Sequence, residues 1–180
     1  MTQSLQAAIK AWSELNPDKK IEEETVVKFT CTTPPIDRID NTVNTMLRMV
    51  VHLSLSTNCI DKIPSLSGMV RLERLSLGRN QIKKVSGLDE VPTLKELWIS
   101  YNQIATLDGL ANLFNLETLY ISNNKLKEES EFKKLAPNVK LVNCNFFGNP
   151  FAENADRSET RILVAKLLPN VKTIDGELMT

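Results

Sequence analysis

The side chains that most often perform catalysis or bind metal ions are scarce in this chain. His52 is its one histidine, and Cys31, Cys59 and Cys144 are its three cysteines. One histidine excludes a zinc site with two histidine ligands, and the cysteines lack the short spacing of zinc-binding pairs. The sequence therefore predicts no metal site and no cofactor.

A nucleophilic centre is equally hard to assemble from these residues. Ser54 and Ser56 follow His52 closely, so a serine–histidine–acid triad is one interpretation of this stretch. We favour a surface histidine on a strand, because the acidic residues are scattered without a spacing that suggests a shared site. Neither G-x-x-x-x-G-K-S/T nor G-x-G-x-x-G occurs, which argues against a phosphate-binding loop. We predict that the protein is not an enzyme.

Length, charge and hydropathy narrow the class of protein further. The 180 residues, enough for one domain with its own core, include 22 Lys and Arg and 22 Asp and Glu, so the net charge is zero. A dedicated nucleic-acid binder would need a broad basic surface. No apolar run approaches the ~20 residues of a membrane span, and no signal peptide is visible. We expect a reduced intracellular protein without nucleic-acid or membrane partners.

An asparagine recurs with a fixed period through the middle of the chain. Asn58, Asn80, Asn102 and Asn124 are each separated by 22 residues, and Asn149 follows after 25. Apolar residues occupy nearly every position three, five and eight before these asparagines, and most positions two, five and eight after them. The pattern L-x-x-L-x-L-x-x-N-x-I/L is that of the leucine-rich repeat. Coincidental amphipathic helices would instead follow a 3.6-residue period.

Each repeat is predicted to form one turn of a curved solenoid. The leucines of L-x-L alternate with exposed residues, as in a short strand with one buried face. The asparagine amide can satisfy backbone groups of the following turn, so stacked repeats would form an asparagine ladder. The stretch Ser86-Gly87-Leu88-Asp89 resembles a helix capping box. The predicted fold class is α/β: about six repeats of 22–25 residues, with a concave parallel sheet and helical turns on the convex side.

The open ends of such a solenoid expose apolar residues and must be capped. Residues 1–25 are predicted to be an N-terminal capping helix with Trp12 on its buried side. Residues 26–151 are predicted to be the repeats. Residues 152–180 are predicted to be a C-terminal cap, with a helix that ends near Pro169 and then a short strand.

The first repeat is degenerate. We place Val26, Phe29 and Cys31 at its apolar positions and Pro34 at its asparagine position. In this frame Cys31 is a core residue, as is Cys144 in a later repeat.

Two large aromatic side chains lie at positions where the strand pattern faces solvent. Trp98 and Tyr120 are equivalent positions of adjacent strands, which lie ~4.8 Å apart, so their rings should touch. An exposed aromatic patch marks a binding site, and Trp, Tyr and Arg are frequent interface anchors. The alternative is that the rings only pack on one another. The predicted partner-binding residues are Trp98, Tyr120, Tyr101, Arg74, Glu96 and Phe147.

Four stretches of the sequence closely resemble the light chain 1 family of axonemal outer-arm dynein: HLSLSTNCIDKIPSLSGM, LSLGRNQIKKVSGLD, ELWISYNQIATLDGL and LYISNNKL. The resemblance spans nearly the whole chain, and departs from the family at the Phe146-Phe147 strand and at Thr160. It implies a non-catalytic light chain that binds the dynein heavy chain at the microtubule-binding domain on the stalk tip. It also implies modulation of the motor–microtubule interaction and a location in the cytoplasm and the cytoskeleton of the ciliary axoneme.

Two groups of basic residues are candidates to face acidic tubulin at that location. One group follows the ladder asparagines along a predicted rim and the other belongs to the C-terminal cap: Lys62, Lys83, Lys84 and Lys127, then Arg157 and Arg161. Such charges act mainly on encounter and weaken with salt. Lysines that only solvate the surface are the alternative.

A second functional class shares the 22-residue period. Phosphatase-regulatory leucine-rich-repeat scaffold proteins also bind partners through the concave face. They usually have more repeats and a more acidic concave face, so we keep this class as the alternative.

Overall fold

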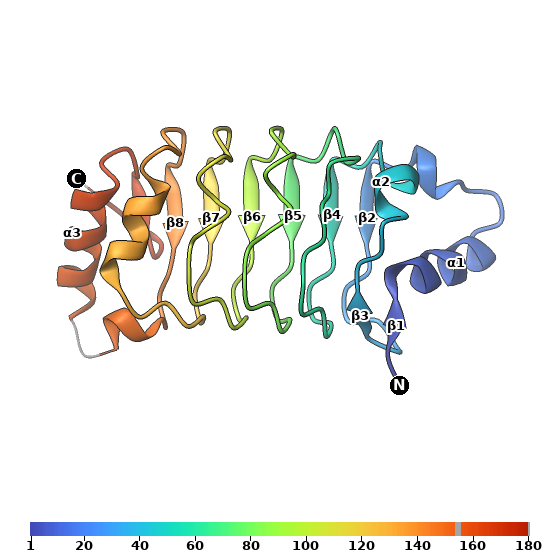
Figure 1. The fold of residues 1–180 in the computed structure, drawn as a ribbon, viewed down its shortest axis with the longest axis horizontal. Coiled ribbons are helices and arrows are strands. Elements are labelled where there is room, and N and C mark those ends of the chain that lie inside the picture. Colours follow the sequence, from blue (N-terminus) through green and yellow to red (C-terminus); the bar gives the residue numbers. More distant parts are fainter. Residues whose placement is uncertain (154–155, 180) are drawn as a thin grey trace.

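Parallel strands stacked side by side form the body of the molecule, which the computed structural model describes over residues 1–153 and 156–179 (Figure 1). They belong to one sheet with the order β10-β9-β8-β7-β6-β5-β4-β2, in which only β10 is antiparallel to its neighbour. The strands of this sheet are β2 (Val26–Lys28), β4 (His52–Ser54), β5 (Arg74–Ser76), β6 (Glu96–Trp98), β7 (Thr118–Tyr120), β8 (Asn143–Asn145), β9 (Thr173–Ile174) and β10 (Glu177–Leu178).

Smaller elements lie mainly towards the two ends of this sheet (Figure 1). At the N-terminal end they are β1 (Gln3–Ser4), α1 (Leu5–Leu15), η1 (Ile21–Glu23), β3 (Ile36–Arg38) and α2 (Val43–Met46). At the C-terminal end they are η2 (Glu129–Leu135), η3 (Pro150–Ala152) and α3 (Arg157–Leu167). Strands β1 and β3 pair in parallel as a separate small sheet. None of the helices that the structure describes is long and apolar enough to cross a membrane.

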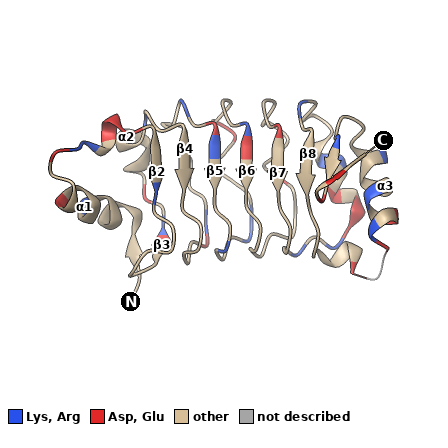
Figure 2. Cartoon of the chain, turned by 180° about the vertical axis from the view of Figure 1, so that it is seen from behind, with Lys and Arg blue, Asp and Glu red and all other residues tan. Residues whose placement is uncertain are grey.

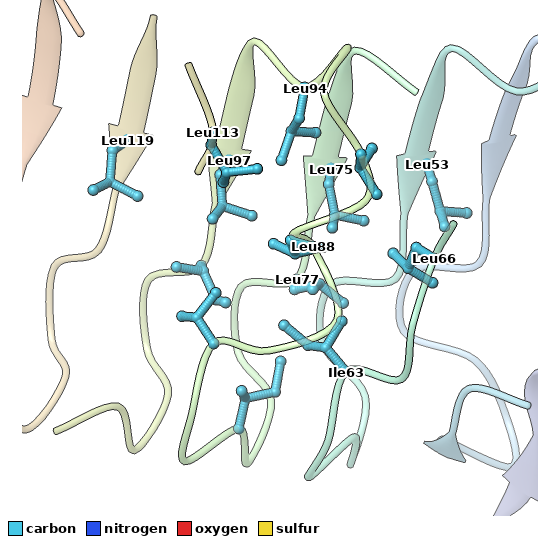
Figure 3. Close-up of a cluster of buried hydrophobic side chains, with 14 of the residues drawn as sticks. Leu53, Ile63, Leu66, Leu75, Leu77, Leu88, Leu94, Leu97, Leu113 and Leu119 are labelled. Atoms are coloured by element: carbon cyan, nitrogen blue, oxygen red, sulfur yellow. The ribbon is translucent and has the colours of Figure 1, made fainter. Parts of the chain in front are cut away.

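The strands pair without a shift from β4 to β7, so equivalent repeat positions form straight rows across the sheet. The inward row contains Leu53, Leu75, Leu97 and Leu119, which have 0% exposure. Figure 3 shows these leucines meeting residues of the return segments, such as Leu66 and Leu88, in one continuous core. Because side chains alternate along a strand, the residues on either side of each inward leucine face outward. We call that outward surface the strand face.

The return segments opposite the strands consist mostly of single hydrogen-bonded turns. In the repeat between β5 and β6, the Val91 N–H donates to the Leu88 carbonyl and the Leu94 N–H to the Val91 carbonyl. The capping-box expectation is wrong, because no helix begins there. Gly87 has φ +72°, and a Cβ at this position would lie 2.1 Å from the Pro64 carbonyl oxygen. The chain therefore enters the turn through a left-handed residue that only glycine accommodates easily.

Helices cover both ends of the core. Helix α1 buries Leu5 and Ile9 against the first repeat, and Trp12 packs half-buried on the same cluster. At the other end α3 buries Val164 and ends at Leu167, two residues before Pro169. The predicted end of the C-terminal helix is therefore confirmed.

The predicted frame of the degenerate first repeat is wrong by two residues. Val26 pairs with His52, so the inward position of β2 is Val27, and Val26 is 50% exposed. Cys31 is exposed rather than in the core. Thr32, not Pro34, occupies the asparagine position. The asparagine position of the first repeat, Thr32, lies 26 residues before Asn58, whereas Pro34 lies 24 residues before it. The longer spacing causes the shift of the frame.

Candidate functional site

The asparagine ladder links each repeat to the repeat that precedes it. Asn102 is 6% exposed; its Oδ1 accepts from the Ile82 N–H at 2.9 Å, and its Nδ2 donates to the Leu77 and Ile99 carbonyls at 3.0 Å. The other members, Asn58, Asn80, Asn124 and Asn149, are also buried and bonded to the backbone on both sides. This repeated bonding fixes the strand face as a rigid, regular surface.

The residue before each repeat turn adopts a left-handed conformation. This position has φ between 50° and 80° in six successive turns: Cys31, Thr57, Arg79, Tyr101, Asn123 and Gly148. Such φ values suit glycine and asparagine, whereas large side chains adopt them at a cost. The geometry turns these side chains outward along the edge where the strands end.

Trp98 and Tyr120 form the centre of the strand face. They are paired in register on β6 and β7, and their rings stack with centroids 5.8 Å apart and planes 19° from parallel. Trp98 remains 36% exposed, and Tyr120 is half-buried. The Tyr120 hydroxyl accepts from the Asn143 amide at 3.0 Å. The rings thus pack on each other, as one alternative predicted, and still present a shared apolar surface to solvent.

Two further exposed rings lie beside this pair, Tyr101 in the turn after β6 and Phe147 in the turn after β8. Tyr101 is 48% exposed and Phe147 is 43% exposed. Each ring carries an arginine: the Arg79 Cζ lies 4.4 Å from the Tyr101 centroid, and the Arg157 Cζ lies 4.1 Å from that of Phe147. We call Trp98, Tyr120, Tyr101 and Phe147 together the aromatic surface.

Arg74 and Glu96 lie beside the aromatic surface and satisfy each other. The Arg74 guanidinium donates to both Glu96 carboxylate oxygens, at 2.7 and 2.5 Å, across the neighbouring strands β5 and β6. This bond to Glu96 raises the pKa of Arg74 above its usual value. The Arg74 Cζ also lies 5.3 Å from the Trp98 ring centroid. The pair appears in Figure 2 as adjacent blue and red segments on β5 and β6, and we infer that it holds the indole in place.

His52 lies next to Arg74 on the strand face. Burial lowers its pKa, and the charges of Arg74 and Lys28 lower it further. In the described part of the chain it has no hydrogen bond to Ser54 or Ser56. A histidine without a serine partner gives no support to the triad interpretation.

The described residues also contain no cluster of three or more His, Cys, Asp or Glu side chains that could hold a metal ion.

A hollow of about 320 Å³ opens between the aromatic surface and α3. Its lining includes Tyr101, Asn145, Phe147, Arg157, Arg161 and Asp175. The Asp175 carboxylate accepts from the Phe146 and Phe147 N–H groups at 2.8 and 3.1 Å. Burial raises the pKa of Asp175 above its usual value, although these bonds and the charges of Arg161 and Arg157 act in the opposite direction.

The two predicted basic groups lie in different places. The exposed lysines Lys62, Lys83, Lys84 and Lys127 follow the ladder turns, as the repeat register requires, and make no ion pair within the described residues. In the next repeat, Thr106 occupies the position equivalent to Lys84, so the row has no lysine there. Lys134 donates to the Thr106 hydroxyl at 2.8 Å, but its charge is paired with Asp108 and Glu131. Arg157 and Arg161, in contrast, lie against the aromatic surface.

Arg79 is the surface residue that our sequence reasoning missed. It occupies the same turn position as Tyr101, one repeat earlier. Extending the comparison of equivalent positions to the residue before each ladder asparagine would have found it. The stacking of Arg157 on Phe147 had no comparable signal, because α3 lies outside the repeats.

Comparison with known proteins agrees with this architecture. The family described as "Leucine Rich repeats (2 copies)" matches residues 49–90 and 92–134. The SNF/U2A′ complex of Drosophila melanogaster contains a chain that superposes with a TM-score of 0.65 and 24% identity, over 72% of this chain and 74% of that one. At this identity the likeness shows the fold alone.

Relatives of much higher identity narrow the assignment. The protein named "Dynein axonemal light chain 1" of Chlamydomonas reinhardtii is 48% identical over 148 residues, which are 79% of this chain and 74% of that protein. Its namesake in Danio rerio is 43% identical over 175 residues, 96% of this chain and 90% of that protein. The chain therefore belongs to the axonemal dynein light chain 1 family of leucine-rich-repeat proteins.

Proposed function

We propose that this chain binds the heavy chain of an outer-arm dynein through the aromatic surface, at the microtubule-binding domain on the stalk tip, and so modulates attachment of the motor to the microtubule. Membership of the family makes it a dynein light chain of the ciliary axoneme. A non-enzymatic role in the motor complex is part of our proposal. The heavy-chain domain and the contact residues are our proposal.

The observation that carries the proposal is the stacked Trp98–Tyr120 pair on a rigid strand face. Burying an exposed Trp and Tyr against a partner removes apolar area from water without a large loss of side-chain freedom, because the rings are already held by stacking and by Arg74. The adjacent Tyr101 and Phe147 extend the same apolar area. Contiguous exposed rings of this kind mark a protein-binding surface.

The phosphatase-regulatory alternative fits the strand face less well. An acidic concave face would be expected there, whereas the two outward rows that run from β2 to β7 contain Lys28, His52 and Arg74, with Glu96 as their one carboxylate.

A matched set of alanine variants tests the proposal. Trp98→Ala and Tyr120→Ala should each weaken binding to the isolated stalk-tip domain by ~2 kcal/mol or more, which is roughly thirty-fold in Kd. Phe114→Ala is the control, because Phe114 is a similarly exposed ring (57%) in a return segment away from the strand face. Isothermal titration gives the affinities, and circular dichroism confirms that each variant is folded. Unchanged affinity for folded Trp98→Ala would mean that the rings only stabilise the sheet.

The lysine row offers a second contact for the assembled complex. We propose that Lys62, Lys83, Lys84 and Lys127 face acidic tubulin while the heavy chain covers the rings. Reversing two of these charges, Lys83→Glu with Lys84→Glu, should reduce cosedimentation of the light chain–stalk tip complex with microtubules at low salt. The same variant should keep its affinity for the stalk tip alone.

A further inference from the structure

Three arginines border the aromatic surface and lack carboxylate partners. Arg79 comes from the turn after β5, and Arg157 and Arg161 come from α3; we call them the arginine rim. None of the three makes an ion pair within residues 1–153 and 156–179, and Arg161 has only a long 3.5 Å bond to the Ser158 hydroxyl. Their guanidinium groups therefore keep most of their hydrogen-bond donors available.

Arg74 shows what a satisfied arginine looks like on the same face. Its guanidinium also lies over a ring, that of Trp98, but its Nε and Nη2 groups donate to the two carboxylate oxygens of Glu96. Arg79 and Arg157 have the ring contact without the carboxylate. Stacking on an aromatic face holds the guanidinium plane in position and leaves its edge free to bind a carboxylate in a bidentate manner.

The acidic residues near the rim do not neutralise it. Asp175 lines the same hollow, but its carboxylate oxygen is directed to the Phe146 and Phe147 N–H groups. Glu177, which also lines the hollow, is exposed and makes no ion pair in the described structure. The hollow thus contains two arginines and two carboxylates, and neither carboxylate is bonded to an arginine, while Arg79 lies on the neighbouring ring of Tyr101.

Backbone conformation places Arg79 and Tyr101 at equivalent positions beside the strand face. Both have a positive φ, 56° and 59°, at a turn position where the next two repeats have Asn123 and Gly148. A large side chain in this region costs about 1–2 kcal/mol relative to a residue that tolerates it. The same conformation occurs at Cys31 and Thr57, so it belongs to the repeat turn and directs the side chains of Arg79 and Tyr101 outward.

We propose that the arginine rim binds carboxylates of the same heavy-chain segment that covers the aromatic surface, an inference that rests on the proposed function. The segment is therefore both apolar and acidic: its apolar side chains lie on Trp98 and Tyr120, and its carboxylates reach the rim. Tyr101 and Phe147 follow strands β6 and β8, which are two steps apart in the sheet, so the backbones of these two ring residues are separated by roughly 10 Å. Arg79 and Arg157 lie over these rings, so carboxylates at least two helical turns apart would be needed to reach both arginines.

The geometry favours the heavy chain over tubulin as the source of these carboxylates. Arg157 lies on the ring of Phe147, and Arg161 and Tyr101 line one hollow. A partner that covers the rings also covers these arginines and removes them from a second partner. This assignment replaces the sequence-based expectation that Arg157 and Arg161 face the microtubule.

Charge-removing variants of matched size test the inference. Arg79→Gln and Arg161→Gln remove one charge each from the rim, and Arg48→Gln removes one from an exposed position near the N-terminal cap. Each is titrated against the isolated stalk-tip domain over a salt series, with Trp98→Ala in parallel. We expect the two rim variants to bind roughly five-fold more weakly at low salt and to converge on the wild type at high salt. Arg48→Gln should match the wild type throughout, and Trp98→Ala should be weak at every salt concentration.

The outcomes separate this inference from the proposed function. If Trp98→Ala weakens binding but both rim variants match Arg48→Gln, the rim does not bind the segment and the proposed function stands. If the wild-type chain does not bind the stalk tip at all, both are overturned. If the rim variants bind the stalk tip normally but lose binding of the light chain to microtubules, the carboxylates belong to tubulin and the inference is wrong.

Discussion

Replacing Asn102 with alanine would remove the partner of one buried backbone group. The Ile82 N–H donates to Asn102 Oδ1 and has no other acceptor in the described structure. The Leu77 and Ile99 carbonyls would each keep a second donor, because the Asn80 and Asn124 amides also bond them. Leaving one buried N–H unpaired costs about 1–3 kcal/mol, so that is the expected loss in the free energy of unfolding.

The ends of the ladder lack this redundancy. Asn149 is the partner of both the Leu126 N–H and the Phe146 carbonyl, and nothing else in the described chain bonds either group. Asn149→Ala should therefore orphan two buried groups and destabilise the fold about twice as much as Asn102→Ala. The ordering of the two variants follows from how neighbouring ladder amides share carbonyls.

Urea unfolding followed by circular dichroism measures the free energy of unfolding of each variant. In thermal unfolding, each kcal/mol of lost stability should lower Tm by roughly 2–4 °C. Asn115→Ala is the control, because Asn115 lies outside the ladder and bonds the Pro92 carbonyl and Lys140 near the surface, where water can replace it. Its change should stay within ~0.5 kcal/mol. Equal losses for Asn102→Ala and Asn115→Ala would refute the ladder account, and equal losses for Asn102→Ala and Asn149→Ala would refute the redundancy argument.

Two further predictions concern titratable groups of the C-terminal half. Burial raises the pKa of Asp175 in the folded state, so ionisation of this carboxyl lowers the free energy of unfolding as the pH rises through that pKa. Asp175→Asn keeps an oxygen acceptor for the Phe146 and Phe147 N–H groups but carries no charge. Asp175→Asn should be at least as stable as the wild type at pH 7 and lose its advantage near pH ~4; a less stable variant at pH 7 would show that the nearby arginines dominate. Burial also raises the pKa of the Cys144 thiol far above its usual value, so a maleimide should label exposed Cys31 in the native protein and Cys144 only after unfolding; rapid native labelling of Cys144 would contradict the buried assignment.

The core and the central surface could be predicted because each depends on repetition. Asparagines at a constant interval define the frame, and the frame determines which side chains face inward and which face each other across strands. Trp98 and Tyr120 were predicted to touch on that basis, and their rings do stack. The prediction needed only the strand spacing and the absence of a register shift.

Features outside the periodic frame could not be predicted in the same way. The first repeat was misaligned at Val26 and Cys31 because its length differs from the others and no asparagine marks its turn. The contact between Arg157 and Phe147 depends on where α3 packs after the last repeat, which no spacing in the sequence specifies. Arg74 and Glu96 were expected to contact a binding partner, but in the structure they bond each other. This pairing depends on side-chain rotamers, which the repeat pattern does not determine.

The strand face has a direction, and this direction constrains how a partner can lie on it. Towards the N-terminal end the outward row that contains the rings continues with the small residues Ser54 and Ser76, which are largely buried and present little surface to a partner. Towards the C-terminal end the row passes through Trp98 and Tyr120 to the hollow lined by Arg157 and Arg161. A uniform apolar face would accept a bound segment in either direction, because hydrophobic contact is non-directional. The distribution of cations breaks this symmetry: Lys28 continues the serine row at one end, whereas Arg157 and Arg161 line the hollow at the other, so reversing an acidic segment would leave these two arginines unpaired. On this argument the rings supply most of the affinity and the arginines set the orientation of the bound segment.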